Sequence, residues 1–125
     1  MEQHYLQILI GNELVSSCVL VVVELRSRKL AMIEEVKTVA VYRNQGYGKR
    51  ILEKAIAKAK ELECDTVELC YNPNRNGDYG KRLYESCGFV EDGNIKAKII
   101  LNEEKSPLDI LYAFLLHLND LNRLI

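Results

Sequence analysis

The sequence predicts a single mixed α/β domain of the α+β type, in which a mostly antiparallel sheet is flanked by helices. Three observations predict it. The first third of the chain alternates β-rich apolar runs with short polar turns, the middle has apolar residues at helical spacing, and short segments of both kinds follow. With 125 residues the chain can bury one core but not two. We therefore treat residues 1–125 as one domain.

The first third of the chain is predicted to form three antiparallel strands. Residues 5–10 and 14–25 are rich in β-forming apolar residues, and Gly11 and Asn12 between them are a turn signal. Polar residues at 26–29 make a second break, after which residues 30–41 have the composition of a third strand. Short turns between successive strands predict an antiparallel meander.

A helix is predicted from Lys49 onward. The apolar residues that recur there at helical spacing are Ile51, Leu52, Ala55, Ile56, Ala59 and Leu62. Residues 65–71 then alternate between apolar and polar side chains, which is typical of a short strand. Residues 72–77 are rich in Asn, Pro and Gly and predict a loop.

The last part of the chain is predicted to contain two helices and two short strands. Residues 79–87 form a short helix that Gly88 ends as a C-cap, and residues 89–90 and 95–101 are strands. Pro107 is placed in the first turn of a helix that continues to the C-terminus. Because that helix is apolar on most of its sides, we expect it to be buried within the domain or against another subunit.

Composition argues against several classes of protein. A net charge of -1 gives no overall attraction to nucleic acid or to anionic lipid, so we expect a small-molecule partner. The four cysteines form no CxxC pair and there are only two histidines, so we expect no metal site. No apolar run approaches membrane-spanning length and no cleavable leader is evident, which predicts a cytoplasmic location.

The strongest local motif is a glycine-containing loop between the third strand and the first helix. It consists of Arg43, Asn44, Gln45, Gly46, Tyr47 and Gly48, followed by Lys49. The first turn of a helix leaves backbone N–H groups without partners and carries partial positive charge, and glycines let a polyphosphate approach that backbone closely. Lys49, Arg50 and Lys54 add positive charge. The pattern predicts an anion-binding loop.

The loop has a purely structural alternative and two rival phosphate-binding motifs. Gly46 and Gly48 can serve only the turn from strand to helix, with the basic residues on a solvated face. A P-loop needs four residues between its first glycine and a Gly-Lys-Ser/Thr sequence. Here the spacing differs, and Lys49 is followed by Arg50 where a P-loop has Ser or Thr. A dinucleotide fingerprint needs three glycines after the first strand of a parallel unit, whereas this loop has two and follows a meander.

Together these residues resemble the GNAT superfamily of N-acetyltransferases. Its signature, Arg/Gln-x-x-Gly-x-Gly/Ala between a strand and a helix, matches Arg43 to Gly48. The segment from Leu83 through Tyr84 to Phe89 resembles the second hallmark, Leu-Tyr-x-x-x-Gly-Phe, and residues 32–38 resemble the acidic central strand. The likeness covers roughly residues 4–92, and residues 95–125 add a strand and a helix. Glucosamine-6-phosphate N-acetyltransferases are loosely the nearest members.

The resemblance implies acetyl-CoA as cosubstrate, without a metal. In the family, coenzyme A contacts the strand before the signature, here Val36, Lys37 and Thr38. Its pyrophosphate takes backbone amides of the signature loop. The corresponding residues are Arg43, Asn44, Gln45, Gly46, Tyr47, Gly48 and Lys49. Members of the family often have an Asn before the second motif that holds the pantetheine arm. At that position this chain has Gly77, and Asn76 is one residue away.

The implied reaction is direct attack of a primary amine, from a small molecule, amino sugar or peptide, on the thioester. An alkylamine titrates at about 10, so a base must accept a proton, and Glu34 or Glu35 is the candidate. Adjacent residues of a strand face opposite sides, so only one can face the cleft. A backbone N–H near Val36 is expected to stabilise the oxyanion. Tyr84 is expected to protonate the leaving thiolate, and Cys87 to be buried packing.

The chain also departs from the family pattern. It begins at what would be the second strand, so the opening strand-helix unit is missing or moved to the C-terminus. The order of the last segments motivates a hypothesis of circular permutation, in which residues 97–101 and the final helix replace that unit. The alternative is a closing hairpin with an added helix that occludes the site or favours a homodimer. The departure also motivates a second function, a catalytically silent acyl-CoA-binding protein or a subunit that needs a partner.

Overall fold

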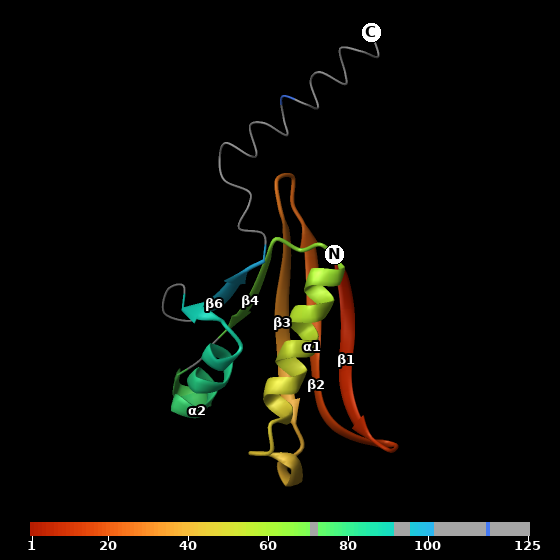
Figure 1. Cartoon of the computed structure of the whole chain (residues 1–125), viewed down its shortest axis with the longest axis vertical. Helices are drawn as coiled ribbons and strands as arrows, with labels where there is room; N and C mark the ends of the chain where they lie inside the picture. The colour runs from red at the N-terminus through yellow and green to blue at the C-terminus, as the bar shows by residue number, and fades with distance from the viewer. Residues whose placement is uncertain (71–72, 92–95, 102–114, 116–125) are drawn as a thin grey trace.

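The computed structural model describes residues 1–70, 73–91, 96–101 and 115. Its centre is a six-stranded sheet with the order β1-β2-β3-β4-β6-β5 (Figure 1). The strands are β1 (Glu2–Ile10), β2 (Glu13–Glu24), β3 (Lys29–Thr38), β4 (Thr66–Cys70), β5 (Val90–Glu91) and β6 (Lys96–Ile100). Strands β3 and β4 are parallel, and all other neighbours are antiparallel. The predicted mixed, mostly antiparallel sheet is confirmed.

The predicted meander is present as β1, β2 and β3. The third strand ends at Thr38, earlier than predicted, because the chain turns into a short 3-10 helix, η1 (Ala40–Tyr42). The backbone N–H of Val39 donates to the carbonyl of Val15 at 2.9 Å, and that of Tyr42 donates to the carbonyl of Val39 at 2.8 Å. This turn starts the loop that leads into the first long helix.

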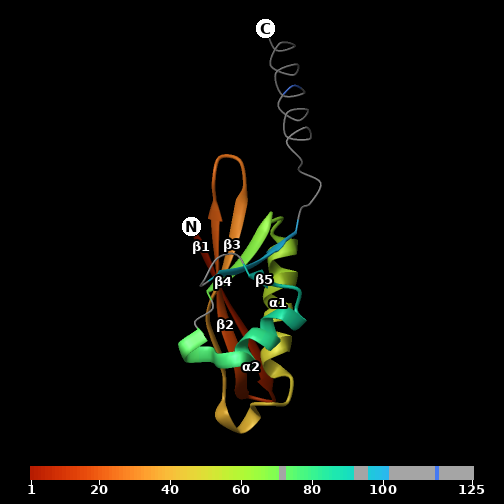
Figure 2. The ribbon, with the colours of Figure 1, turned by 90° about the vertical axis from the view of Figure 1, so that its left-hand side faces the viewer.

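Helix α1 (Tyr47–Glu61) covers one face of the meander. Its residues Ile51, Leu52, Ala55 and Ala59 are buried, because their spacing places them on one side of the helix. They pack in one core with residues of β1, β2 and β3. Figure 2 shows α1 on one side of these strands. The helix begins at Tyr47 rather than at Lys49.

The predicted loop at residues 72–77 is wrong for residues 73–77. Helix α2 (Pro73–Ser86) begins at Pro73, whereas a helix was predicted only from residue 79. Proline is well suited to the first helical position, since its missing N–H would have no partner there and its φ is already helical. That preference outweighs the turn tendency of the Asn and Gly residues that follow. Position 72 lies outside the described residues.

The hypothesis of circular permutation is wrong for the strand at residues 97–101, which does not take the place of a strand beside β1. Strand β6 pairs with β4 and with β5, at the opposite end of the sheet from β1. The register sets Ala97 beside Leu69 and Ile99 beside Val67, so the apolar residues of β6 extend the core over β4. The alternative of a closing hairpin therefore describes β5 and β6.

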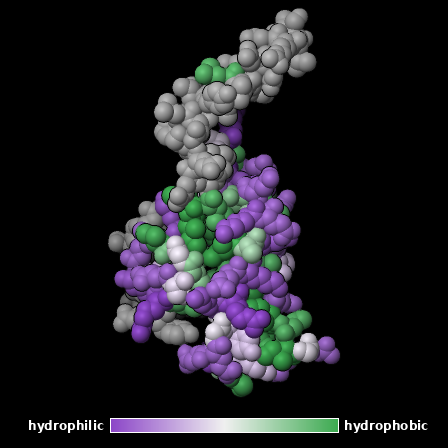
Figure 3. Space-filling view, in the orientation of Figure 1, coloured by the Kyte–Doolittle hydropathy of each residue, from purple (hydrophilic) through white to green (hydrophobic). Residues whose placement is uncertain are grey.

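The final helix lies outside the described residues except for Leu115, whose side chain is 53% exposed. Among the residues that are described, no helix is both long enough and apolar enough to cross a membrane. Figure 3 shows polar surface over much of the face that carries α1, with hydrophobic surface also visible at the lower end, where Figure 1 places η1 and the β1–β2 turn. Leu9, Ile10 and Val41 are exposed in these two segments.

Replacing Thr66 by valine is expected to stabilise the fold. The Thr66 Oγ1 atom is buried and has no hydrogen-bond partner among the described residues. Valine has nearly the same shape without the unsatisfied hydroxyl, so Thr66→Val should raise the free energy of unfolding by about 1 kcal/mol. Urea denaturation measures this. Thr38→Val, which removes a bonded hydroxyl, should lower it, and a loss of stability in Thr66→Val would contradict the assignment.

Candidate functional site

The site is built on a place where two parallel strands separate. Strand β3 pairs with β4 only from Leu30 to Ile33, opposite Thr66 to Leu69, although β3 continues to Thr38. Beyond Ile33 that edge of β3 has no strand partner among the described residues. Backbone groups of an unpaired edge are available to a ligand that forms strand-like hydrogen bonds.

A β-bulge lies in β3 where this separation begins. Ser17 pairs with Lys37 and Val19 with Glu34, so Cys18 alone faces both Glu35 and Val36. The φ of Glu35 is +52°, in the left-handed region that residues other than glycine rarely adopt. A bulge interrupts the ladder and turns the strand, so the edge is re-aimed at this point. The expected bulged strand near Val36 is present.

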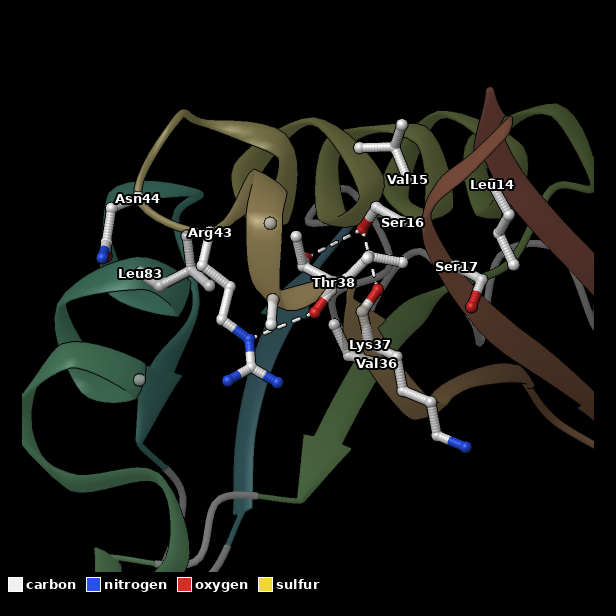
Figure 4. A pocket seen from close by; sticks show the side chains of 14 residues that line it. Leu14, Val15, Ser16, Ser17, Val36, Lys37, Thr38, Arg43, Asn44 and Leu83 are labelled. Atoms are coloured by element: carbon white, nitrogen blue, oxygen red, sulfur yellow. Dashed lines mark hydrogen bonds between the residues drawn. The ribbon is translucent and has the colours of Figure 1, made fainter. Parts of the chain in front are cut away.

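A cleft of about 730 Å³ opens beside the unpaired part of β3 (Figure 4). It lies between the end of β3, the loop before α1, the start of β2 and one side of α2. Its lining residues are Leu14, Val15, Ser16, Ser17, Val36, Lys37, Thr38, Val39, Ala40, Arg43, Asn44, Gly48, Gly80 and Leu83. The predicted residues Val36, Lys37, Thr38, Arg43, Asn44 and Gly48 are thus brought together around one space.

The loop reaches α1 through two left-handed residues. Asn44 has a φ of +64°, and Gly46, at the N-cap of α1, has a φ of +88°. Among the described residues no side chain caps the helix, and no acidic residue lies in its first turn. Its first backbone N–H groups are therefore without a side-chain partner in the part of the chain that the structure describes, and the loop glycine is required by its backbone conformation.

Gly48 allows close packing between three elements. A Cβ atom at Gly48 would lie 3.1 Å from Leu83 of α2 and 4.0 Å from the hydroxyl oxygen of Thr38 in β3. The absence of a side chain therefore leaves space at the junction of α1, α2 and β3. That space belongs to the cleft.

The arginine of the loop motif braces the loop against β3. The Arg43 Nε–H donates to the carbonyl oxygen of Thr38 at 3.2 Å, and Figure 4 shows the guanidinium group turned toward this strand end. The side-chain amide of Gln45 donates to the carbonyl of Val41 at 3.0 Å, so Gln45 supports the loop and does not line the cleft.

Tyr47, Arg50 and Lys54 also serve the scaffold. The ring of Tyr47 packs edge-to-face on Tyr42, with centroids 5.8 Å apart, and the Arg50 guanidinium lies 5.4 Å from the Tyr47 ring centroid. The Lys54 ammonium donates to the carbonyl of Gln7 in β1 at 2.6 Å. The mobile charge predicted for Arg50 and Lys54 is therefore partly committed to structural contacts.

Unlike Arg50 and Lys54, Lys49 has no structural contact among the described residues that would occupy its ammonium group. It lies in the first turn of α1, its side chain is exposed, and it has no hydrogen bond or ion pair with any residue that the structure describes. It does not line the cleft, but an ammonium group beside the open N–H groups adds attraction for an anion. The side chain of Asn76 lies outside what the structure describes.

Both candidate bases are exposed and neither lines the cleft. Glu34 pairs with Val19 while Ile33 is buried, so Glu34 points to the face of the sheet away from α1. Glu35 is the bulged residue with positive φ, so the simple alternation expected for the pair is broken there. Both residues directly follow Ile33, where the pairing of β3 with β4 ends.

Tyr84 lies in the core rather than in the cleft lining. Its side chain is 3% exposed, and its hydroxyl donates to Glu91 Oε1 at 2.9 Å. The Lys81 ammonium is 3.5 Å from the same oxygen. The neighbouring residue, Leu83, is the one that faces the cleft. The phenol is therefore one residue away from the space it was expected to face.

Sequence reasoning missed the contribution of β2 to this site. Ser16 lines the cleft, yet its side chain is 1% exposed. Its hydroxyl donates to the carbonyl of Lys37 at 3.0 Å and lies 3.1 Å from the hydroxyl oxygen of Thr38. The available signal was a serine at an inward-facing position of an otherwise apolar strand, where a polar residue needs a partner.

No cysteine has the environment of an activated nucleophile. Burial raises the pKa of the Cys87 thiol above its usual value, and the same cause raises the pKa of Cys64. Burial also raises the pKa of Cys18 to about 11. Cys87 was predicted to be buried, but it is only half-buried. Among the described residues no group of three His, Cys, Asp or Glu side chains could hold a metal ion.

Comparison with known proteins identifies the family. The sequence profile described as the acetyltransferase (GNAT) family matches residues 1–89. The chain belongs to this family. A comparison with curated protein sequences found no match.

Solved structures have the same fold. A chain from Agrobacterium tumefaciens, assigned as an acetyltransferase, is 28% identical with a TM-score of 0.68; the match covers 74% of this chain and 65% of that one. A Bacillus subtilis acetyltransferase in complex with CoA is 21% identical, with a TM-score of 0.67 and coverage of 79% and 77%. Glucosamine-6-phosphate N-acetyltransferase from Arabidopsis thaliana is 22% identical, with a TM-score of 0.58 and coverage of 66% and 54%.

The match thus spans less than two thirds of the Agrobacterium chain. The likenesses at 21% and 22% identity are likenesses of fold. They support the sheet topology of this chain.

The cysteines are expected to differ sharply in reactivity. With a pKa of about 11, about one Cys18 thiol in a thousand is ionised at pH 8, and its side chain is buried, whereas Cys70 is exposed. Timed alkylation followed by mass spectrometry should modify Cys70 in the native protein and Cys18 only after unfolding. Raising the pH from 7 to 9 should leave Cys18 unmodified, since both values lie below its pKa. Rapid native labelling of Cys18 would contradict this packing.

Proposed function

We propose that this chain is an acyl-CoA-dependent N-acetyltransferase. It transfers the acetyl group of acetyl-CoA to a primary amine of a small molecule, amino sugar or peptide by direct attack. The observation that carries the proposal is the cleft in which the unpaired end of β3 meets the open N-terminus of α1. Membership in the GNAT family supports the donor.

The residues of the cleft suit the parts of acetyl-CoA. The open N–H groups at the start of α1, with Lys49 beside them, suit its pyrophosphate. The edge of β3 from Val36 to Thr38 suits an extended chain of amides, because it lacks a strand partner. Apolar cleft residues such as Leu14 and Leu83 suit the alkyl segments. Acetyl-CoA supplies the activated thioester.

The bulge supplies groups for the chemistry. Glu35 and Val36 share one partner across the ladder, so a backbone N–H at this point is available to an oxyanion. Glu34 or Glu35 accepts a proton from the incoming amine, directly or through water, at the open end of the strand separation. Tyr84 is the proposed proton donor for the departing thiolate.

The acceptor enters from the side where β3 leaves β4, and the reaction takes place in the cytoplasm.

A second copy of the chain is the proposed partner, as a homodimer. The sheet face away from α1 supports this, because the register places Tyr5, Val19, Val21 and Met32 there and Tyr5 is 72% exposed. A sedimentation mass of one chain at micromolar concentration would exclude the dimer.

One observation favours a second function, a silent acyl-CoA binder or a subunit completed by a partner. The single proton of the Tyr84 phenol is directed to Glu91 and not to the cleft. A panel of amines distinguishes the two functions. Coenzyme A release with at least one small amine, amino sugar or peptide supports the enzyme, whereas binding without release in every case supports the silent protein.

Binding of coenzyme A should depend on the left-handed glycine of the loop. Gly46→Ala forces a side chain into a strained conformation, costing about 1 kcal/mol and shifting the N–H groups of the first turn. Calorimetry should show at least about tenfold weaker binding. Gly11→Ala is the matched control, because Gly11 also has a positive φ, +62°, in the β1–β2 turn and does not line the cleft. Equal effects of the two substitutions would remove the loop from the binding site.

Turnover should depend on the hydroxyl of Tyr84. Loss of a general acid slows a reaction by about a hundredfold or more, so Tyr84→Phe should lower kcat far more than it changes the Kd of acetyl-CoA. Tyr5→Phe serves as the control, since Tyr5 is exposed on β1 and its hydroxyl donates to the side chain of Gln3 on the same strand. Equal turnover in Tyr84→Phe and the unaltered protein would exclude Tyr84 from the mechanism.

A further inference from the structure

The buried hydroxyl of Ser16 is part of a directed chain of hydrogen bonds. A carbonyl oxygen only accepts, so the single proton of Ser16 goes to the carbonyl of Lys37, 3.0 Å away. In the second bond, 3.1 Å long, the hydroxyl of Thr38 must therefore donate to Ser16 Oγ. Figure 4 shows both bonds joining β2 to the end of β3. Ser16 is the one buried polar residue among those that the structure describes.

This chain determines how the end of β3 is oriented. Successive residues of a strand direct their backbone groups to opposite edges, so a Lys37 carbonyl directed at β2 leaves the backbone of Thr38 on the free edge. There the carbonyl of Thr38 accepts the Arg43 Nε–H at 3.2 Å. The Lys37–Thr38 segment is thus held from β2 by Ser16 and from the loop by Arg43.

The bulge makes such a hold necessary. Glu35 has a left-handed backbone and interrupts the ladder, and β3 has already lost β4 beyond Ile33. Only the pairs from Ser16 and Ser17 of β2 follow the bulge before the strand ends at Thr38. Just beyond Thr38 the N–H of Val39 is bonded to the carbonyl of Val15, and among the described residues few other backbone bonds oppose a rotation of this strand end about its axis. A buried, fully bonded hydroxyl opposes that rotation at the edge of the cleft.

We propose that Ser16 is a positioning residue for the acyl-CoA arm. It acts through Lys37 and Thr38, by keeping the free edge of β3 turned toward the cleft that the arm occupies. The proposal rests on the proposed function, because the arm is that of the cosubstrate. Ser16 would hold the backbone in the free protein too, so the cleft is preorganised for its ligand.

Substitution of Ser16 tests the proposal by calorimetry with coenzyme A. Ser16→Ala should weaken binding by about tenfold, since a buried hydrogen bond is lost at the surface that the ligand meets. Ser16→Thr retains the hydroxyl and should restore binding to within about threefold. Where transfer is measured, Ser16→Ala should raise the KM for acetyl-CoA with little change in kcat.

The control is Thr66→Val, which removes from β4 a buried hydroxyl that has no hydrogen-bond partner in the described part of the chain. It should leave coenzyme A binding unchanged. A purely structural role of Ser16 would lower the melting temperature of Ser16→Ala without changing the Kd measured well below it. That result overturns the proposal.

The outcomes separate this inference from the proposed function. If the unaltered protein does not bind coenzyme A, the proposed function fails. If the unaltered protein binds and Ser16→Ala binds within about twofold of it, only the inference fails. Should Ser16→Ala not fold, Thr38→Val removes the donor at the other end of the chain, and unchanged binding in that variant overturns the proposal.

Discussion

The separation of β3 from β4 after Ile33 is the constraint on which the site depends. A parallel pair that continued to Thr38 would satisfy the backbone of β3 and fill the space in which the cleft now lies. The bulge at Glu35 supports the separation, because an extra residue turns the strand at the point where it leaves β4. The open edge is thus a built feature of the sheet and not a frayed end.

The surrounding elements support that edge from three directions. Strand β2 contributes a buried hydroxyl, the loop contributes the guanidinium of Arg43, and α1 packs against the same strands through its apolar face. Tyr47, Arg50 and Lys54 tie the start of α1 to its neighbours, so the N–H groups of its first turn are held at one end of the cleft. Several basic residues of the motif are therefore better described as parts of the scaffold than as direct ligands.

Local chemistry explains which features were predictable from the sequence. The meander, α1 and the glycine loop have strong local signals in Gly11, in the apolar spacing from Ile51 to Ala59, and in Gly46. The start of α2 was missed because Asn and Gly around residue 75 favour turns, while Pro73 favours a helix start, and composition does not rank the two effects.

Long-range pairing explains the rest. The placement of β6 beside β4 depends on which edge is open, and the role of Ser16 depends on a partner in another strand. The environment of Tyr84 is set by the turn at Gly88, which brings Glu91 back to the phenol. None of these can be deduced from spacing along the chain.

Amide chemical shifts during a titration with coenzyme A test the central claim most directly. The account predicts that the amides of Val36, Thr38 and the first turn of α1 shift and become protected from exchange, while those of the turn between β2 and β3, which does not line the cleft, do not. Titration that leaves the β3 end unchanged, or that shifts only residues remote from the cleft, would contradict the account.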